Sequence, residues 1–265
     1  MLKGKVALIT GAGQGVGQGI ALAMAAKGAS IAVTGRTLSK LENTCAMINE
    51  HGGKAIAIRC NVKDPTSLKH TVDKTIRQFS TIDILVNNAG YALPYAFEKN
   101  SVEDEENCIR VLGTSVISLT KLFVLNMIKN NSGIIMIVSS VAAFAPPAAI
   151  QVMYGPLKTF MNRFSEALNI NYNSKGITST ALCPGYTVTN FHTASGVQDE
   201  MDSVPQFLKK SASRIAEEGV IGMLNGKKTI VPTKTWRVIV FLIKIVPQFI
   251  FHFLSGILAP GRYDN

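Results

Sequence analysis

The chain has 265 residues, 47% hydrophobic and 17% charged, so it can bury a sizeable core, and we expect one large domain rather than two. The net charge is +10, and half of it falls in the apolar last forty residues, which favours an anionic membrane surface over nucleic acid. The four cysteines include no Cys-x-x-Cys pair, so we expect no metal site and reduced thiols in a cytoplasmic protein. Because the first predicted strand begins at Val6, we also expect no signal peptide of the usual length.

That strand, Val6–Thr10, is followed by a cluster of glycines with the sequence Gly11-Ala12-Gly13-Gln14-Gly15-Val16-Gly17. The alanine-rich residues 20–27 then predict a helix. A strand, a glycine turn and a helix N-terminus together can hold a dinucleotide pyrophosphate, because the glycines let the backbone approach it and the helix offers unpaired N–H groups. The spacing is Gly-x-x-x-Gly-x-Gly rather than Gly-x-Gly-x-x-Gly, and an ordinary tight turn is the alternative.

The second predicted strand, residues 30–34, ends at Gly35-Arg36-Thr37. In a dinucleotide site this end faces the adenosine ribose, where an acidic residue binds the 2′-hydroxyl of NAD and an arginine suits the 2′-phosphate of NADP. The chain has Arg36 and Thr37 there and no acid, so the sequence favours NADP(H) over NAD(H). A solvated surface arginine is the alternative.

Strands and helices continue to alternate along the chain, which predicts βαβ units and a parallel sheet. Further strands are predicted at Lys54–Arg59, 82–86, Gly133–Val138, 177–183 and 228–232. Further helices are predicted at 38–51, from Pro65 onward, at 101–127 with Ser101 as the N-cap of an acidic first turn, and at 154–174.

Five motifs follow one another along this pattern: the glycine turn, Asn87-Asn88-Ala89-Gly90, Ser139-Ser140, Tyr154-x-x-x-Lys158, and Pro184-Gly185-Tyr186-Thr187-Val188-Thr189. In this order the chain resembles a short-chain dehydrogenase/reductase over nearly its whole length. The resemblance implies an α/β fold, a doubly wound (Rossmann) and mainly seven-stranded parallel sheet with helices on both faces, and a nicotinamide cofactor. We assign residues 1–234 to this catalytic domain, with a substrate-loop insertion at 190–220, and residues 235–265 to an apolar, basic, helical C-terminal extension.

The same resemblance implies the catalytic residues. Tyr154 would be the acid/base, Lys158 would tune it and bind the nicotinamide ribose, and Ser140 would hydrogen-bond the substrate oxygen. A tyrosine with its ordinary pKa of about 10 is a poor base at pH 7, and we expect the ammonium and the cofactor's positive ring to lower that pKa. Ser140 is preferred to Ser139 because Val141-Ala142-Ala143 fits the family's sequence after the catalytic serine. Without Ser140, a plain surface pair on one helix face would be the simpler interpretation of Tyr154 and Lys158.

The cofactor-binding residues implied by the resemblance, besides Arg36, Thr37, Tyr154 and Lys158, are Gly11, Gln14, Gly15, Val16 and Gly17 at the phosphates, Asn61 and Val62 at the adenine, Asn88, Ala89 and Gly90 at the central ribose, and Pro184, Gly185, Val188 and Thr189 at the nicotinamide. Asn61 replaces the family's usual aspartate, and its amide oxygen can still accept a hydrogen bond from the adenine.

One position departs from the family pattern. Many members carry an asparagine in the helix after the fourth strand, which holds a water that passes protons to the lysine. Alignment puts Leu112 at this position, and a register shifted by two puts Arg110 there. Leucine cannot bind the water, so a weak enzyme, or a cofactor-binding regulator or scaffold with little catalysis, is the alternative to an efficient oxidoreductase.

The loops expected around the substrate are apolar, with Ser140, Phe144, Ile150 and Tyr186 as candidate substrate contacts. They favour a lipid, fatty-acyl or steroid-like alcohol or carbonyl compound. Residues 236–258 are almost all apolar, but Pro247 interrupts them and neither half reaches the roughly 20 residues of a spanning helix. We expect two short helices that lie on a membrane surface, through 235–258, or cover the cleft or a subunit interface. A membrane-surface interaction protein is a third reading, and the family resemblance implies a homo-oligomer, dimer or tetramer.

Overall fold

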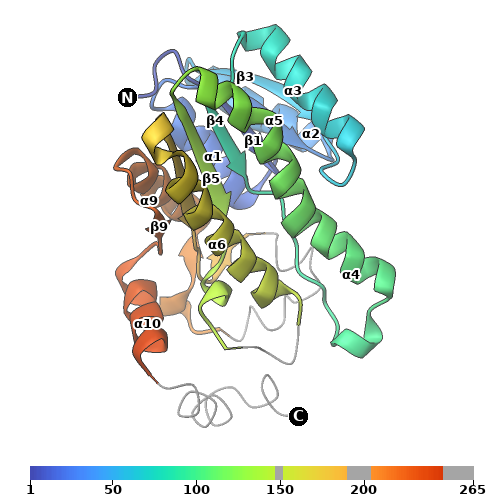
Figure 1. Ribbon diagram of the computed structural model, residues 1–265, viewed down its shortest axis with the longest axis vertical. Coiled ribbons are helices and arrows are strands. Elements are labelled where there is room, and N and C mark those ends of the chain that lie inside the picture. The colour runs from blue at the N-terminus through green and yellow to red at the C-terminus, as the bar shows by residue number, and fades with distance from the viewer. Residues whose placement is uncertain (147–151, 190–203, 247–265) are drawn as a thin grey trace.

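A seven-stranded parallel sheet forms the centre of the protein in the computed structural model, which describes residues 1–146, 152–189 and 204–246 (Figure 1). The strands are β1 (Val6–Thr10), β2 (Ser30–Gly35), β3 (Lys54–Arg59), β4 (Ile84–Asn87), β5 (Gly133–Val138), β6 (Ile177–Leu182) and β9 (Thr229–Ile230). Their order across the sheet is β3-β2-β1-β4-β5-β6-β9, and every pair is parallel. The doubly wound α/β fold is therefore confirmed. The strand order reverses between β1 and β4, which is where such sheets bind ligands.

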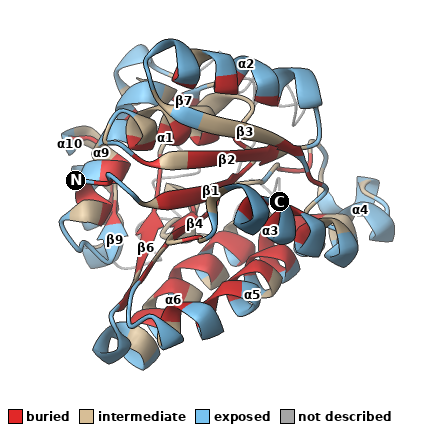
Figure 2. Ribbon diagram, turned by 90° about the horizontal axis from the view of Figure 1, so that it is seen from above, coloured by how far each residue is buried: buried red, intermediate tan, exposed pale blue. Residues whose placement is uncertain are grey.

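Helices cover both faces of the sheet, so the strands are buried on two sides (Figure 2). One layer holds α1 (Gly15–Ala25), α2 (Leu38–Glu50) and α9 (Ala212–Leu224), and the other holds α3 (Pro65–Phe79), α4 (Val102–Ile109), α5 (Ser115–Lys129) and α6 (Tyr154–Tyr172). Leu8 packs into the core beneath the second layer and its neighbour Ile9 into the core beneath the first. This two-sided burial explains why the strands read as continuous apolar runs.

The helix predicted at 101–127 is divided by a π-helical turn, Arg110–Thr114, between α4 and α5. Its start is as predicted, because the Ser101 hydroxyl accepts a hydrogen bond from the backbone N–H of Asp104, at 3.1 Å, in a capping box. The whole run, Val102–Lys129, is the one helix among the described residues that is long and apolar enough to cross a membrane. Leu119 and Phe123 of this run belong to the core, which accounts for its apolar character.

Two predicted boundaries are wrong. The first helix begins at Gly15 rather than at residue 20, because the glycine turn itself forms the first turn of α1. The insertion predicted over 190–220 ends earlier, since α9 begins at Ala212 and packs along α1. The two helices approach so closely that a Cβ on Gly19 would lie 2.9 Å from the Cβ of Ala216. The buried stripe of α9, which includes Ile215 and Val220, is hidden among polar residues in the sequence.

The predicted C-terminal extension begins with α10 (Lys234–Ile245), which lies beyond the end of the sheet (Figure 1). Trp236 and Val240 are its buried residues, and the Trp236 indole donates a hydrogen bond to the carbonyl of Leu208 at 3.0 Å. The remainder of the extension, from residue 247 onward, lies outside the described residues, as does the second of its two predicted helices.

Candidate active site

Thr10, the last residue of β1, joins the glycine turn to the motif that follows β4. Its hydroxyl accepts hydrogen bonds from the backbone N–H groups of Asn88, at 2.9 Å, and Ala89, at 3.0 Å. The side-chain amide of Asn88 in turn donates to the carbonyls of Thr10, at 2.8 Å, and Gly11, at 3.1 Å. These four bonds hold the ends of the two central strands together at the point where the strand order reverses.

The glycine turn has the shape and the donors that a pyrophosphate requires. Gly15 has a φ of +62°, and a Cβ on Gly17 would overlap the Asn88 amide and the Gly11 carbonyl. Gln14, the N-cap residue of α1, makes no side-chain capping bond, so the first-turn N–H groups of the helix are available to an anion. The residues present therefore fit a dinucleotide phosphate.

Lys40 also reaches this turn, although the sequence did not single it out. Its ammonium lies 2.6 Å from the Gln14 side-chain oxygen, and its Cβ is 3.0 Å from where a Cβ on Gly13 would be. The only signal in the sequence is a lysine in the first turn of the helix that follows Arg36. A second cation thus stands beside the predicted phosphate site.

Arg36 and Thr37 lie exposed at the end of β2, and Asn61 and Val62 follow the end of β3 at the same edge of the sheet. Arg36 is close enough to Tyr91, the residue after Gly90, to act on it electrostatically. Burial raises the pKa of Tyr91 to about 12, and the Arg36 charge opposes that rise. The Asn61 oxygen accepts from the backbone N–H of Lys63 at 3.2 Å, which leaves it one lone pair for an adenine.

Ser140, Tyr154 and Lys158 come together where β5 ends and α6 begins. The Ser140 hydroxyl is hydrogen-bonded to Tyr154 and accepts from the backbone N–H of Ala142 at 3.1 Å. The Lys158 ammonium is buried, lies 5.4 Å from the centre of the Tyr154 ring, and donates to the carbonyl of Val138 at 2.9 Å.

The neighbouring serine has a different task. The Ser139 hydroxyl donates to the backbone carbonyl of Lys158 at 2.9 Å, so it ties α6 to the end of β5. Of the two serines, Ser140 is the one bonded to the tyrosine, as the choice made from the sequence requires.

Burial shifts the pKa values of both Tyr154 and Lys158. Burial raises the pKa of Tyr154 to about 12, while the Ser140 hydrogen bond lowers it. Burial also lowers the pKa of Lys158 to about 8. The expected lowering of the Tyr154 pKa involves the cofactor's positive ring as well as the lysine, and among the protein's own groups burial is the largest cause acting on that pKa. The Tyr154 hydroxyl therefore carries its proton at neutral pH.

Leu112 lies in the π-helical turn and is completely buried beside Lys158. A Cβ on Gly90 would lie 2.9 Å from the Leu112 Cδ2 and 3.9 Å from the Lys158 Nζ, so both side chains border the same point. Arg110, the alternative register, is exposed and pairs with Glu106 at 3.5 Å. The structure thus brings Leu112, and not Arg110, towards the lysine.

The segment after β6 closes the other side of the site. A Cβ on Gly15 would lie 3.3 Å from the Thr189 Cβ, so the phosphate turn and the predicted nicotinamide segment face each other. This segment begins with the buried residue Pro184. It then forms the short strand β7 (Thr187–Val188), which pairs with β8 (Lys210–Ser211). Trp236 packs against the backbone of Gly185 so closely that a Cβ there would overlap the indole.

The predicted substrate contacts meet α10. The Tyr186 and Trp236 ring centres are 5.7 Å apart, and the Lys244 ammonium lies 4.7 Å from the centre of the Phe144 ring. Trp236 and Lys244 are contacts that the sequence did not predict, because they depend on how α10 folds back. Ile150 lies outside the described residues.

Apart from Tyr154 and Lys158, which lie on α6, the predicted cofactor residues follow the carboxyl ends of strands β1 to β4 and β6, namely Gly11, Gln14, Gly15, Val16, Gly17, Arg36, Thr37, Asn61, Val62, Asn88, Ala89, Gly90, Pro184, Gly185, Val188 and Thr189. Because the strands are parallel, these ends share one edge of the sheet. Within the described part of the chain, no three His, Cys, Asp or Glu side chains gather in a group that could hold a metal ion.

Comparison with known proteins gives the family. The model of the short chain dehydrogenase family matches residues 5–200. A 3-oxoacyl-[acyl-carrier-protein] reductase of Synechocystis sp. is 33% identical over 190 residues, which cover 71% of this chain and 76% of that protein. An 11-beta-hydroxysteroid dehydrogenase-like 2 protein of Arabidopsis thaliana is 30% identical over 258 residues, 97% of this chain and 82% of that protein.

Solved structures share the fold. A short-chain dehydrogenase from Sphingobium yanoikuyae in complex with NADPH matches with a TM-score of 0.80 and 24% identity, over 92% of this chain and 96% of that one. A 3-ketoacyl-(acyl-carrier-protein) reductase from Brucella melitensis complexed with NADH matches with a TM-score of 0.78 and 25% identity, over 87% of this chain and 97% of that one. The chain belongs to the short-chain dehydrogenase/reductase family of oxidoreductases.

Proposed function

We propose that the protein is an NADP(H)-dependent oxidoreductase that interconverts an apolar alcohol and its carbonyl compound, with Tyr154 as the acid/base. The observation that carries the proposal is the triad itself. Ser140 is bonded to Tyr154, and the buried Lys158 ammonium lies 5.4 Å from the tyrosine ring. This group stands at the same sheet edge as a glycine turn that fits a pyrophosphate.

The residues divide the chemistry as follows. The nicotinamide, when bound, supplies or accepts the hydride. Tyr154 is protonated at neutral pH, so in the reducing direction its hydroxyl gives a proton to the carbonyl oxygen as negative charge develops there. The Ser140 hydroxyl donates a hydrogen bond to the same oxygen. Lys158, fixed by the Val138 carbonyl, holds a positive charge beside the tyrosine and stabilises the phenolate that remains.

The preference for NADP(H) rests on charge at the ribose end of the site. Arg36 follows β2 with no acidic residue beside it, and the Lys40 ammonium stands over the glycine turn. Guanidinium and ammonium groups both bind phosphate oxygens, and an arginine suits the 2′-phosphate of NADP(H). NAD(H) remains the less favoured cofactor.

The proposed substrate class is inferred from two aromatic rings. Phe144 follows Ser140 in the chain, and Tyr186 follows β6. They favour a lipid, fatty-acyl or steroid-like compound. The names of two relatives are consistent with this class, because one is a 3-oxoacyl-[acyl-carrier-protein] reductase and the other an 11-beta-hydroxysteroid dehydrogenase-like protein. The latter alignment also extends through α10, over 97% of this chain.

We also propose a cytoplasmic homo-oligomer with peripheral membrane contact through 235–258. All four cysteines are buried and unpaired, which suits a reducing compartment. Along α10, Val238, Phe241 and Ile245 are each more than half exposed, so an apolar surface is available to a bilayer or to a second copy. Sedimentation with vesicles of anionic lipid tests the membrane contact.

A regulator or scaffold with little catalysis is the second candidate, and Leu112 is the observation that favours it. Its side chain occupies the place beside Lys158 where the family usually has an asparagine. An assay of NADPH oxidation with a panel of apolar ketones and aldehydes separates the two candidates. A regulator binds the nucleotide but oxidises it with none of them.

Replacement of Tyr154 by phenylalanine tests the assigned acid/base. We expect Tyr154→Phe to lower kcat by about 10²–10⁴-fold or more, because the proton donor is lost. NADPH affinity, measured by calorimetry, should change by no more than about twofold, because the ring remains. Retained turnover in the variant would remove Tyr154 from the mechanism.

A further inference from the structure

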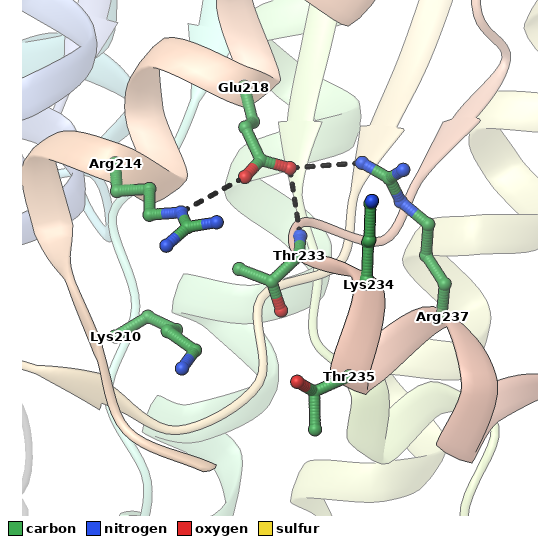
Figure 3. Close-up of a pocket in the computed structure, with 7 residues that line it drawn as sticks. All are labelled: Lys210, Arg214, Glu218, Thr233, Lys234, Thr235 and Arg237. Atoms are coloured by element: carbon green, nitrogen blue, oxygen red, sulfur yellow. Dashed lines mark hydrogen bonds and ion pairs between the residues drawn. The ribbon is translucent and has the colours of Figure 1, made fainter. Parts of the chain in front are cut away.

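A second polar pocket, of about 340 Å³, lies where α9, α10 and β8 meet (Figure 3). Its lining comes from both helices and the strand, and consists of Lys210, Arg214, Glu218, Thr233, Lys234, Thr235 and Arg237. None of these residues is among those assigned to the dinucleotide or to the catalytic triad. The pocket therefore has no task in the proposed reaction.

Its charge is strongly positive. Four cationic side chains line it with one carboxylate, Glu218. That carboxylate is already engaged, since it pairs with Arg214 at 3.3 Å and Arg237 at 3.0 Å and accepts from the backbone N–H of Thr233 at 2.8 Å. These bonds lower the pKa of Glu218 although burial acts to raise it. Its negative charge is thus fully present at neutral pH, and the pocket still carries an excess of positive charge.

Thr233 supplies a second, independent sign of a ligand. It is 2% exposed, and its hydroxyl oxygen is buried with no hydrogen-bond partner among the described residues. A buried hydroxyl without a partner costs roughly 1–3 kcal/mol of stability, so such groups are rare unless something binds them. Thr233 is one of the residues that line the pocket, and in Figure 3 its hydroxyl is directed towards Lys210 and Thr235, away from the Glu218 carboxylate.

The N-terminus of α10 opens onto the same space. Thr233 is the N-cap residue of this 12-residue helix, yet its side chain makes no capping bond. The first backbone N–H groups of the helix and the positive end of its dipole are therefore directed towards an anion. Hydroxyl donors, lysine and arginine side chains and a helix N-terminus are together the donors that a phosphate group requires.

We propose that this pocket binds the phosphate group of a ligand, at a site separate from the catalytic one. The ligand is a phosphate ester, either a soluble one or the headgroup of a phospholipid. The second source is compatible with α10, which carries the exposed apolar side chains Phe241 and Ile245 on the same helix. The Thr233 hydroxyl and the Lys234 ammonium are the contacts that define the site, because neither is used by Glu218.

The test uses inorganic phosphate as the probe, with the full chain saturated with NADPH to fill the glycine turn. Calorimetric titration at constant ionic strength is expected to show one binding event. We expect Thr233→Val and Lys234→Gln each to weaken phosphate binding at least about tenfold, and Lys74→Gln, an exposed lysine on α3, to change it less than twofold.

Thermal unfolding provides a second readout, in which the variant that loses phosphate binding is expected to lose no stability when phosphate is absent. Without phosphate, Thr233→Val should keep or raise the midpoint of unfolding, because it removes an unpartnered buried hydroxyl. With phosphate, the wild-type protein should be stabilised and the variant should not. If the variant still folds but binds phosphate as tightly as the wild type, the site is refuted.

Vesicles distinguish the two sources of phosphate. The protein is mixed with vesicles of phosphatidylcholine alone or with added phosphatidic acid. Binding that needs phosphatidic acid, is lost in Thr233→Val and is displaced by inorganic phosphate identifies a lipid headgroup. Phosphate binding without such vesicle binding identifies a soluble ester. If neither probe responds to Thr233→Val or Lys234→Gln, the pocket is an ion-pair cluster and the proposal fails.

Discussion

At the scale of the residue, the burial of Lys158 has a cost to stability. Lys158 is 4% exposed, and within the described part of the chain no carboxylate forms an ion pair with its buried ammonium. Burial lowers its pKa from 10.5 to about 8. The folded protein therefore binds this proton less tightly than the unfolded chain does, which links the stability of the fold to pH.

The sign of this effect can be tested with Lys158→Met. Between about pH 8 and pH 10.5 the lysine is charged in the unfolded chain but neutral in the folded one. The unfolded state therefore binds more protons, and the contribution of Lys158 to the free energy of unfolding rises with pH. We expect the free energy of unfolding of the wild type, relative to the variant, to increase by about 3 kcal/mol from pH 7.5 to pH 10.5.

Urea unfolding at pH 7.5, 9 and 10.5 measures this difference, and titration of Tyr154 cancels to first order because both proteins keep it. Lys74→Met, which replaces an exposed lysine, should show no such slope. A constant difference between the wild type and Lys158→Met across these pH values would show that the lysine is not destabilised in the fold.

The proposed preference for NADP(H) depends chiefly on Arg36. Arg36 is exposed at the end of β2, with the Lys40 ammonium at the neighbouring glycine turn. Arg36→Asp replaces a phosphate ligand by a group that repels phosphate and can accept from a ribose hydroxyl. We expect kcat/KM with NADPH to fall by about 10–100-fold, and kcat/KM with NADH to hold or rise. Steady-state rates measured with both nucleotides test this expectation, and Lys74→Glu is the control for added negative charge. An equal loss with both nucleotides would contradict the assignment.

At the scale of the element, the π-helical turn Arg110–Thr114 determines which side chain lies beside Lys158. It turns Leu112 into the core, next to the point that Lys158 also borders. An isobutyl group cannot hydrogen-bond a water, so we expect this position to favour packing over the proposed proton transfer. A mutation at this position can therefore exchange packing for hydrogen bonding.

Leu112→Asn should raise kcat by as much as about tenfold, since a positioned proton relay contributes to acid–base catalysis. The same change should lower the free energy of unfolding by about 2–4 kcal/mol, because it removes apolar packing and buries an amide. Leu112→Ala is the matched control, which loses the packing without gaining the amide and should not gain turnover. If Leu112→Asn folds and its kcat does not exceed that of Leu112→Ala, the leucine does not limit the relay.

How far the sequence predicts these elements depends on how local their causes are. The strands Val6–Thr10 and Lys54–Arg59 and the Ser101 N-cap depend on neighbouring residues, and they are found as predicted. The start of α1 is not, because its glycines are poor helix formers and the packing of Gly17 against Asn88 overrides that preference.

The candidate site shows the same division. The order of the motifs places Ser140, Tyr154 and Lys158 together, because parallel strands bring their carboxyl ends to one edge. Their pKa values are not predictable from the motif, since desolvation depends on what the fold stacks around them. Lys40 and Trp236 are missed for a related reason, because each reaches the site from an element distant in the sequence.

At the scale of the whole molecule, α10 connects the C-terminal part of the chain to the active site. Trp236 is its anchor: it is 7% exposed, packs on Gly185, lies beside the Tyr186 ring and bonds to the Leu208 carbonyl. These contacts join α10 to the predicted nicotinamide segment and to the chain before β8. We therefore expect the position of the cofactor to depend on the packing of α10.

Graded substitutions at this residue measure the coupling. Trp236→Ala should lower the free energy of unfolding by about 3–5 kcal/mol, since a buried indole leaves a cavity. Trp236→Phe keeps most of the packing but leaves the Leu208 carbonyl without its donor, so the loss should be about 1 kcal/mol. Urea unfolding gives both values.

The same two variants separate a structural anchor from one that also shapes the site. Because a Cβ on Gly185 would overlap the indole, the backbone of this glycine can shift when the ring is removed. We therefore expect KM for NADPH to rise several-fold in Trp236→Ala and to stay near the wild-type value in Trp236→Phe, measured where both variants are fully folded. An unchanged KM in Trp236→Ala would mean that α10 stabilises the domain without positioning its cofactor.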